Sequence, residues 1–301
     1  MTASNTPIIQ KRRKPYTPFD IALVIVCILL AFLFVYPIYY IFVAAFAEPA
    51  DIFSNPIIIL PRTFSLYNMQ MMFSAPSIWV GYRNTVFYMC LGTVINVSLT
   101  MLLAYALAQK ELPARRVVNF LVTFTMFFSG GMIPIYLVVK ELGLLNTIWA
   151  IVLPGAISTW NLLITRTYLD SQIPHELMEA AYVDGAGEYR VFFQIVLPLA
   201  KPIIITIAMF YASAHWNAWF GAMIYLRDRR LYPLQIFMRE LLIQNDASSV
   251  ASAAGDYGNT AMYVLTMKYA VMVASVLPLL LVFPFAQKYF EKGIMIGALK
   301  G

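Results

Sequence analysis

Five polar or aromatic residues interrupt two long apolar stretches of the chain, and their types suit the binding of a sugar. Trp160 and Asn161 fall in one stretch, and His215, Trp216 and Asn217 fall in another. Asparagine and histidine supply donors and acceptors for hydroxyl groups, while flat aromatic rings pack against sugar rings. Each residue also has a structural alternative, because amides tie membrane helices together and tryptophans gather at the membrane interface. For His215 the alternative is a neutral imidazole bonded to a neighbouring helix.

A second group of residues, in the polar stretch 173–202, has the types and spacing of a helix, a turn and another helix. Pro174 suits the first turn of a helix, because its missing N–H group costs nothing there. Asp184 and Gly185 then break the helical pattern, since glycine readily takes the left-handed conformation that ends a helix. A second helical stretch is expected from about 187 to 196. The first helix has a small, shallow apolar face that could fit a groove in another protein, and this face consists of Leu177, Ala180 and Ala181.

The composition places these residues in a membrane protein. Of the 301 residues, 61% are apolar and 12% are charged, and the mean hydropathy is +0.72. A soluble domain of this size leaves about a quarter of its unfolded-chain surface exposed, so it could not hide so much apolar surface. A soluble enzyme, a disordered chain and a disulfide scaffold are therefore excluded. The net charge of +6 is interpreted as basic residues kept on one side of a membrane, and no nucleic-acid partner is expected.

Six segments are long and apolar enough to cross a bilayer, at about 21–46, 86–108, 117–139, 147–168, 203–226 and 267–287. They are continuously apolar and do not alternate in polarity, which argues against barrel strands and predicts an all-α polytopic membrane protein. The first segment is too long for the apolar core of a secretory signal peptide, so it is expected to remain as an anchor. In the third segment, Ser129, Gly130 and Gly131 together with Pro134 could interrupt the helix.

The distribution of Lys and Arg orients the predicted spans. More of these residues fall in the connections on the side of the N-terminus, which places both termini in the cytoplasm. The predicted organisation is a cytoplasmic segment 1–20, a six-span domain 21–287 and a cytoplasmic tail 288–301. Within the domain, the connections 47–82 and 227–266 are expected outside, and the long polar connection 170–201 is expected inside.

The inner connection resembles the EAA loop of ABC-importer permease subunits. The shared pattern is Glu179-Ala180-Ala181, then Asp184 and Gly185, and after nine further residues the run Ile195-Val196-Leu197-Pro198, placed before the penultimate span. The resemblance covers nearly the whole chain. It is greatest to carbohydrate permeases of the maltose-transporter type, in a branch that handles complex and often acidic oligosaccharides. The stretches 127–139, 215–220 and 292–301 are similar to that branch.

The resemblance implies the membrane subunit of an ATP-driven importer, with the type I importer permease fold, and not an enzyme. Residues 174–187 would form a coupling helix that docks in an ATPase subunit through Glu179, Ala180, Ala181, Asp184 and Gly185. The implied partners are a second homologous permease subunit, two ATPase subunits and an external solute-binding protein, in a bacterial cytoplasmic membrane. The implied substrate is an oligosaccharide, with an anionic, uronate-type sugar as one candidate.

Two alternative functions, a secondary transporter and a membrane enzyme, remain to be weighed against this interpretation. Ion-coupled transport usually needs acidic residues at membrane depth, and the six segments contain no Asp or Glu. A membrane enzyme would need a clustered acid, base or metal set, and only His215 falls deep in a segment, since the other histidine is His175. The chain has no GxxxxGK[ST] loop, so ATP and Mg²⁺ are expected on the ATPase partner and no cofactor is expected here.

Overall fold

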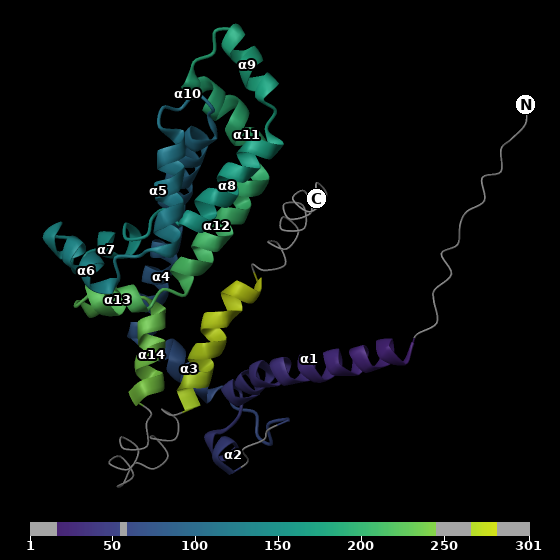
Figure 1. Ribbon diagram of the computed structural model, residues 1–301. Helices are drawn as coiled ribbons and strands as arrows, with labels where there is room; N and C mark the ends of the chain where they lie inside the picture. The colour runs from purple at the N-terminus through teal and green to yellow at the C-terminus, as the bar shows by residue number, and fades with distance from the viewer. Residues whose placement is uncertain (1–16, 55–58, 245–265, 282–301) are drawn as a thin grey trace, which may run out of the picture.

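The computed structural model describes residues 17–54, 59–244 and 266–281, and these residues are helical almost throughout (Figure 1). Among them the extended pairing is limited to an isolated bridge between Ala47 and Phe64. The predicted all-α fold is therefore confirmed. Most of the predicted segment 1–20, residues 245–265 of the predicted connection 227–266 and all of the predicted tail 288–301 lie outside the described residues.

The longest helix, α4 (Pro76–Ala108), is the centre of the fold. It begins at Pro76, whose fixed φ suits a first helical turn. It packs against α8 (Thr159–Gln172), α12 (Lys201–Trp216) and α14 (Leu234–Gln244). Small polar residues on α4 are buried at these contacts and bond across to the neighbouring helices, as polar side chains in membrane bundles do; they are Asn84, Thr85, Asn96 and Thr100.

The third predicted span is interrupted where glycines were expected to interrupt it. It consists of α5 (Arg115–Phe127) and α6 (Met132–Glu141), which meet at an angle of 115°. Gly131 between them has a φ of +86°, a conformation that other residues rarely adopt. The predicted interruption is therefore present, and the chain turns sharply at this break, so the segment 117–139 consists of two helices.

The fourth and fifth predicted spans are also divided. The fourth contains the short helix α7 (Trp149–Val152), a break with Gly155 at φ +75°, and α8. The fifth contains α12, a break at residues 217–219 and α13 (Phe220–Tyr225). In the described part of the chain, α1 and α4 are the two single helices long and apolar enough to cross a membrane, and the total rises to four if each strongly bent pair is one span. Broken backbone at membrane depth is tolerated where it lines a cavity.

Helix α1 (Pro18–Ala45) projects away from the other helices (Figure 1). The side chain of Thr17 and that of Asp20 bond reciprocally to each other's backbone N–H groups and begin this helix. Its most apolar stretch is not buried by any other described residue. Only its C-terminal end is attached, where Ala44 and Ile52 of α2 (Pro49–Ser54) form a small core and Tyr40 meets Tyr269 edge to face.

One end of the molecule is formed by α9 (His175–Val183) and α10 (Glu188–Val191), which confirms the predicted helix, turn and helix (Figure 1). The chain continues through a π-helical turn, η1 (Phe192–Val196), and α11 (Leu197–Leu199). It then bends by 79° into α12, which has Pro202 in its first turn. Residues of η1 and α12 pack here against α4 and α8 in the largest core cluster, in which Leu107, Leu169 and Val196 are buried.

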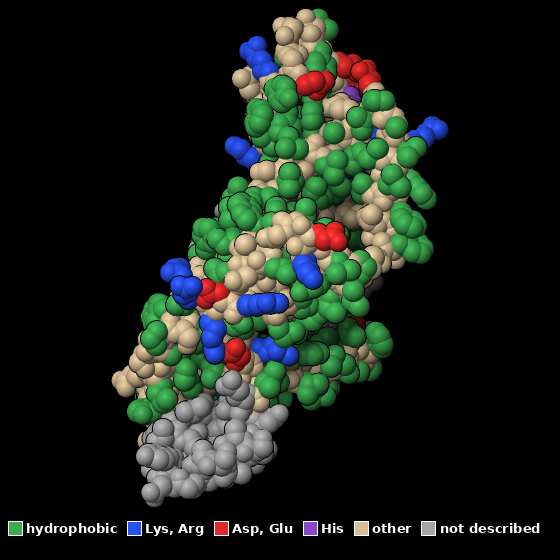
Figure 2. Space-filling view, turned by 90° about the vertical axis from the view of Figure 1, so that its left-hand side faces the viewer, with side chains coloured by type: hydrophobic (Ala, Val, Ile, Leu, Met, Phe, Trp, Pro, Cys, Tyr) green, Lys and Arg blue, Asp and Glu red, His purple; other side chains and the backbone are tan. Residues whose placement is uncertain are grey.

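The opposite end is formed by α3 (Tyr67–Ser74), the 3-10 turn η2 (Arg229–Leu231), α14 and the helix Thr266–Leu281. Leu234 and Phe237 of α14 are buried against α4 and the last helix. In Figure 2, charged side chains gather at the top, where α9 lies, and in a belt across the lower half of the molecule, and the surface between these two groups is mostly hydrophobic. A hydrophobic band between two charged zones fits a body embedded in a bilayer.

Candidate functional site

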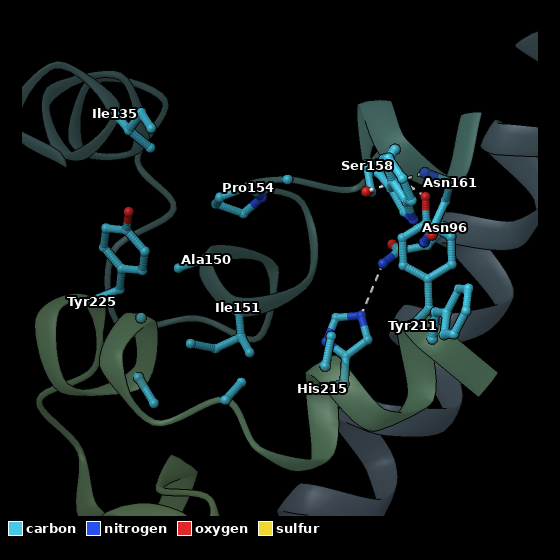
Figure 3. Close-up of a pocket in the computed structure, with 17 residues that line it drawn as sticks. Asn96, Ile135, Ala150, Ile151, Pro154, Ser158, Asn161, Tyr211, His215 and Tyr225 are labelled. Carbon is cyan, nitrogen blue, oxygen red and sulfur yellow. Dashed lines mark hydrogen bonds between the residues drawn. The ribbon is translucent and has the colours of Figure 1, made fainter. Parts of the chain in front are cut away.

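A cavity of about 680 Å³ lies where the broken segments meet α4 (Figure 3). Its wall includes Asn96 of α4, Asn161 of α8, Tyr211 and His215 of α12, and Tyr225 of α13. The break between α7 and α8 supplies a further part of the wall, with Pro154, Gly155 and Ser158. The interrupted helices thus leave a cavity lined by amides, an imidazole, hydroxyls and aromatic rings.

His215 is held against α4 at two adjacent turns. Its Nε2 lies 3.0 Å from the amide nitrogen Nδ2 of Asn96 (Figure 3). One turn earlier, Gly92 leaves the space that the imidazole occupies, because a Cβ at this position would lie 2.3 Å from Nε2. Asn96 is 3% exposed, and its carbonyl oxygen Oδ1 is buried without a hydrogen-bond partner in the described residues.

Tyr211 organises the neighbouring part of the wall. Its hydroxyl lies 2.7 Å from Oγ1 of Thr100 on α4 and accepts a hydrogen bond of 2.9 Å from the backbone N–H of Ser158. The side chain of Ser158 in turn accepts from the backbone N–H of Asn161 and begins α8. This chain of contacts fixes the position of Asn161 relative to α4, and it leaves Trp160 57% exposed at the edge of the cavity.

Of the five residues predicted to contact substrate, the structure brings three together. Trp160, Asn161 and His215 line the cavity, whereas Trp216 and Asn217 do not. The helix turns by about 100° per residue, so three consecutive residues cannot share one face.

The structure gives the other two residues local roles. Trp216 is buried and donates from Nε1 to the carbonyl of Ser275, 3.0 Å away, which ties α12 to the last helix. Asn217 donates to the carbonyl of Ser213 at the end of α12. The structure therefore places Trp216 and Asn217 outside the lining of this cavity.

Sequence reasoning did not place Asn96, Ser158, Tyr211 and Tyr225 in the cavity wall. A signal was present for Asn96, because a polar amide at membrane depth faces a cavity or a neighbouring helix. The distance between Asn96 and His215 in the chain, 119 residues, hides their contact from any reading of local periodicity. Tyrosine is common throughout this chain, so Tyr211 and Tyr225 gave no comparable signal.

The predicted ATPase-docking residues occupy the end of the molecule formed by α9. Glu179 and Ala180 are exposed, Ala181 is half-buried, and Met178 is buried and attaches the helix to the core. Glu179 makes no hydrogen bond or ion pair with any described residue. Asp184 and Gly185 end α9, and Gly185 has a φ of +80°, as its place at the turn requires.

Three side chains connect α9 and α10 to α4. Tyr105 of α4 donates to Oε2 of Glu188 at 2.7 Å, and Tyr182 of α9 donates to the same oxygen at 3.0 Å. The two tyrosine hydroxyls lie 3.3 Å apart. Burial raises the pKa of Tyr182, so its phenol keeps the proton that it donates. The ring of Tyr105 also packs against Phe192, with centroids 5.1 Å apart.

An ionic cluster joins α5 and α8 near the same end. Asp170 lies 3.4 Å from Arg115 and 3.5 Å from Arg166, and Arg166 also donates to the side chain of Asn119. Arg115 donates to the carbonyl of Leu107 near the end of α4. Both arginines interact with a single carboxylate, and together these contacts link α4, α5 and α8. The cluster has no acid–base pair of the kind used in catalysis.

The chemistry of the cavity is uncharged. No Lys, Arg, Asp or Glu is among the described residues that line it. Nor does the described part of the chain contain a group of three or more His, Cys, Asp or Glu side chains that could hold a metal ion. The described wall therefore offers neutral hydrogen-bonding groups and flat apolar surfaces to a ligand.

A helical membrane body with broken helices around a polar cavity, and an exposed helix-turn-helix at one end, defines a membrane permease. The chain belongs to the family described as "Binding-protein-dependent transport system inner membrane component", whose model matches residues 8–296. It is 39% identical over 288 residues to the polygalacturonan/rhamnogalacturonan transport system permease protein YtcP of Bacillus subtilis (strain 168). That alignment covers 94% of this chain and 98% of the relative.

Two further comparisons agree with this family. Protein LplC of Bacillus subtilis (strain 168) is 41% identical over 265 residues, which is 88% of this chain and 89% of the relative. Among solved structures, the crystal structure of a bacterial ABC transporter involved in the import of the acidic polysaccharide alginate matches with a TM-score of 0.84 and 30% identity. The match covers 92% of this chain and all of the matched chain.

Family membership establishes the kind of protein. The chain is a permease subunit of an ABC importer, and it is a transport component of the inner membrane and not an enzyme. Hydrolysis of ATP is carried out by a separate subunit in such transporters. The type I importer permease fold expected from the resemblance is confirmed.

Proposed function

We propose that this permease moves an oligosaccharide, of the uronate type, from an external binding protein into the cell. The observation that carries the proposal is the cavity beside α4, in which Asn161 and His215 supply hydrogen-bonding groups and Trp160 supplies an exposed ring. The uronate assignment draws on two relatives, one named for polygalacturonan and rhamnogalacturonan transport and one for alginate import.

Energy for transport enters through α9 in this proposal. Glu179 is exposed and has no ion-pair partner among the described residues, so its carboxylate is available to a basic group of an ATPase subunit. Ala180 and Ala181 allow close approach, and Asp184 and Gly185 shape the turn that follows. ATP and Mg²⁺ bind to the ATPase partner, because this sequence contains no phosphate-binding loop of the GxxxxGK[ST] type.

The working transporter contains this chain, a second homologous permease subunit, two ATPase subunits and an external solute-binding protein. Both termini and α9 lie on the cytoplasmic side, as the distribution of basic residues favours. The cavity supports a second permease subunit, because Trp160 at its edge is 57% exposed and the described residues leave this edge uncovered.

Reconstitution tests this function directly. The purified complex of both permeases and the ATPase subunits is placed in proteoliposomes with ATP inside and the binding protein outside. Uptake of radiolabelled trigalacturonate that requires both ATP and the binding protein is the expected result. Uptake that instead follows an imposed ion gradient without ATP would identify a secondary transporter and contradict the proposal. A complex that hydrolyses ATP but accumulates no oligosaccharide would contradict the substrate class.

A further inference from the structure

We propose that Arg239 of α14 binds a carboxylate of the anionic sugar on the outer side of the permease, before the sugar reaches the cavity beside α4. The inference rests on the proposed function, because it assigns a binding partner to the charge of a uronate sugar. It adds a cationic site to a path whose described cavity wall contains no Lys or Arg. Trp219, the residue directly before α13, is assigned as the residue that positions Arg239.

Arg239 packs against one side of α13. Its guanidinium carbon Cζ lies 4.9 Å from the centre of the Trp219 ring, and its Nη1 donates to Sδ of Met223 at 3.1 Å. Trp219 and Met223 are four residues apart, so they lie on the same side of this segment. Ala222 and Tyr225 line the cavity from another side of the same helix. A single short helix therefore has the cavity on one side and Arg239 on another.

The guanidinium of Arg239 lacks a strong acceptor among the described residues. A guanidinium carries five N–H donors, and the contact found here is to the thioether sulfur of Met223, which is a weak acceptor. Glu240, the next residue in the chain, pairs with Arg229 instead. Arg239 is half-buried and has no ion-pair partner in the described part of the chain, so its remaining donors are available to a ligand.

The surface around Arg239 is accessible in the described structure. Trp219 and Met223 are 39% and 40% exposed, and Leu242 and Ile243, one turn further along α14, are exposed as well. These apolar neighbours keep part of the water away, so a charge pair formed there is screened less than one on a fully solvated surface. The ring of Trp219 also restricts the guanidinium before a ligand arrives, which lowers the entropy lost on binding.

A carboxylate matches the available donors. The guanidinium is planar, keeps its charge at any physiological pH, and presents paired N–H groups that fit the two oxygens of a carboxylate. A neutral sugar hydroxyl could accept a single, weaker hydrogen bond from the same group. The site therefore distinguishes a uronate sugar from a neutral sugar of the same length.

The location of Arg239 suits an early step of transport. Helix α14 extends from α13 towards the end of the molecule opposite α9, which is the outer side in the proposed function (Figure 1). A sugar that arrives from this end meets Arg239 before it meets the part of the cavity wall that α13 forms. A cation at such a place raises the local concentration of an anionic ligand and speeds its arrival.

Direct binding to the complete transporter, without the binding protein, tests the inference. The complex is placed in phosphatidylcholine nanodiscs, and equilibrium dialysis gives the Kd of radiolabelled trigalacturonate and of its carboxyl-reduced, neutral counterpart. We expect the unaltered transporter to bind trigalacturonate more tightly than the neutral sugar. Arg239→Gln should weaken trigalacturonate binding about tenfold and leave the neutral sugar within about twofold. Arg239→Lys keeps the charge but loses the paired donors, so a loss of about threefold is expected.

The matched control is Arg230→Gln. Arg230 is an arginine of the same outer end with a side chain that is 86% exposed, but its guanidinium donates to both carboxylate oxygens of Asp228. This variant removes the same charge without removing an available site, so both Kd values should be unchanged at physiological ionic strength.

Two substitutions of Trp219 test its positioning role. Trp219→Leu removes the ring that holds the guanidinium and should weaken trigalacturonate binding alone, by about threefold. Trp219→Phe keeps a ring and should restore most of the affinity. Co-purification of the ATPase and the Tm of the complex check assembly of every variant. If Arg239→Gln does not assemble, Arg239→Lys and the Trp219 pair carry the test.

Four results would overturn the inference. Equal binding of the two sugars by the unaltered transporter, or binding of neither, would mean that the site does not exist. Equal losses for both sugars in Arg239→Gln would mean that Arg239 only holds α13 in place. An equal loss in Arg230→Gln would mean that the general positive charge attracts the sugar. Loss of the preference for trigalacturonate when phosphatidylglycerol is added to the nanodiscs would identify a lipid phosphate as the ligand of Arg239.

The reconstitution experiment separates failure of this site from failure of the proposed function. Uptake of trigalacturonate by a transporter in which Arg239→Gln binds both sugars normally would reject the site and leave the proposed function standing. A transporter that takes up no trigalacturonate would reject the substrate class, and the inference with it.

Discussion

At the scale of single residues, the cavity depends on contacts between groups that are distant in the chain. Gly92 and Asn96 lie on adjacent turns of α4, and the imidazole of His215 on α12 packs against Gly92 and forms a hydrogen bond with Asn96. Tyr211, one turn before His215, is fixed in the same way by Thr100. Small and polar residues on α4 thus determine where the side chains of α12 point, which is how membrane helices pack closely and remain specific.

The Gly92→Ala variant should destabilise the protein, because the new methyl group would collide with the imidazole of His215. Overpacking of this kind costs about 1–3 kcal/mol. We expect a lower Tm for the detergent-solubilised complex. Gly221→Ala is the control, since a Cβ there would have its nearest neighbour at 3.7 Å, an ordinary contact. An equal Tm for the two variants would contradict the proposed packing of His215 against Gly92.

How far the sequence predicts this site depends on the range of the interactions. Sequence reasoning selected Trp160, Asn161 and His215, which line the cavity, because polar residues at membrane depth are costly and therefore informative. Trp216 and Asn217 were grouped with His215 by sequence, but Trp216 lies on another side of α12 and Asn217 follows the end of that helix, so neither lines this cavity. The partners of His215 depend on how α12 packs against α4, and a local sequence pattern carries no information about that packing.

At the scale of elements, the positions of the helices were easier to predict from the sequence than the angles at which the helices bend. Hydropathy detects the apolar length of a segment, and it detects all of α5 and α6 as one run. The bend of 115° between them depends on Gly131 at φ +86° and on how each half packs. The interruption could be inferred from the glycines, but its angle could not, because packing partners set that angle.

The hydrogen-bonded contact between α4 and the α9–α10 end of the molecule can also be tested. Tyr105→Phe removes the hydrogen bond to Glu188 but keeps the ring against Phe192. A hydrogen bond to a charged group contributes about 1.5–3 kcal/mol, and less where the carboxylate is exposed. We expect ATP hydrolysis to continue while less sugar is imported per ATP. The control is Tyr168→Phe, whose hydroxyl makes no hydrogen bond with the described residues. An unchanged ratio in Tyr105→Phe would show that this connection does not transmit movement.

The exposed face of α9 should be the contact with the ATPase. Replacing Glu179 with Lys reverses a charge that no described residue neutralises, so a basic group on the ATPase would be repelled. We expect weaker co-purification of the ATPase and lower sugar-stimulated ATP hydrolysis, with unchanged Tm of the permease. Glu111→Lys is the control, because Glu111 is also exposed but lies on the connection between α4 and α5. Normal sugar-stimulated ATP hydrolysis in Glu179→Lys would show that Glu179 is not part of the contact with the ATPase.

At the scale of the whole molecule, α1 is the helix that the described residues leave largely unpacked. No other described residue buries its most apolar stretch, and its N-terminal end projects away from the other described helices (Figure 1). A line of aromatic rings, Phe32, Tyr36 and Tyr40, follows one side of the helix towards Tyr269. The hydroxyl of Tyr36 has no partner among the described residues, and a hydroxyl at membrane depth is better satisfied by protein than by lipid tails.

We therefore expect α1 to pack against the second permease subunit in the assembled transporter. Cys27, which is exposed on α1, is a native probe for this contact. In a Cys90→Ser background, a lipid-soluble maleimide should label Cys27 readily in the isolated chain and slowly in the complex, both measured in the same nanodiscs. Cys90 in a Cys27→Ser background reports whether the reagent enters both samples, since it is exposed on α4. Equal labelling of Cys27 in the two samples would mean that α1 faces lipid in the assembly. The second permease subunit would then have to contact another surface of this chain to enclose the cavity.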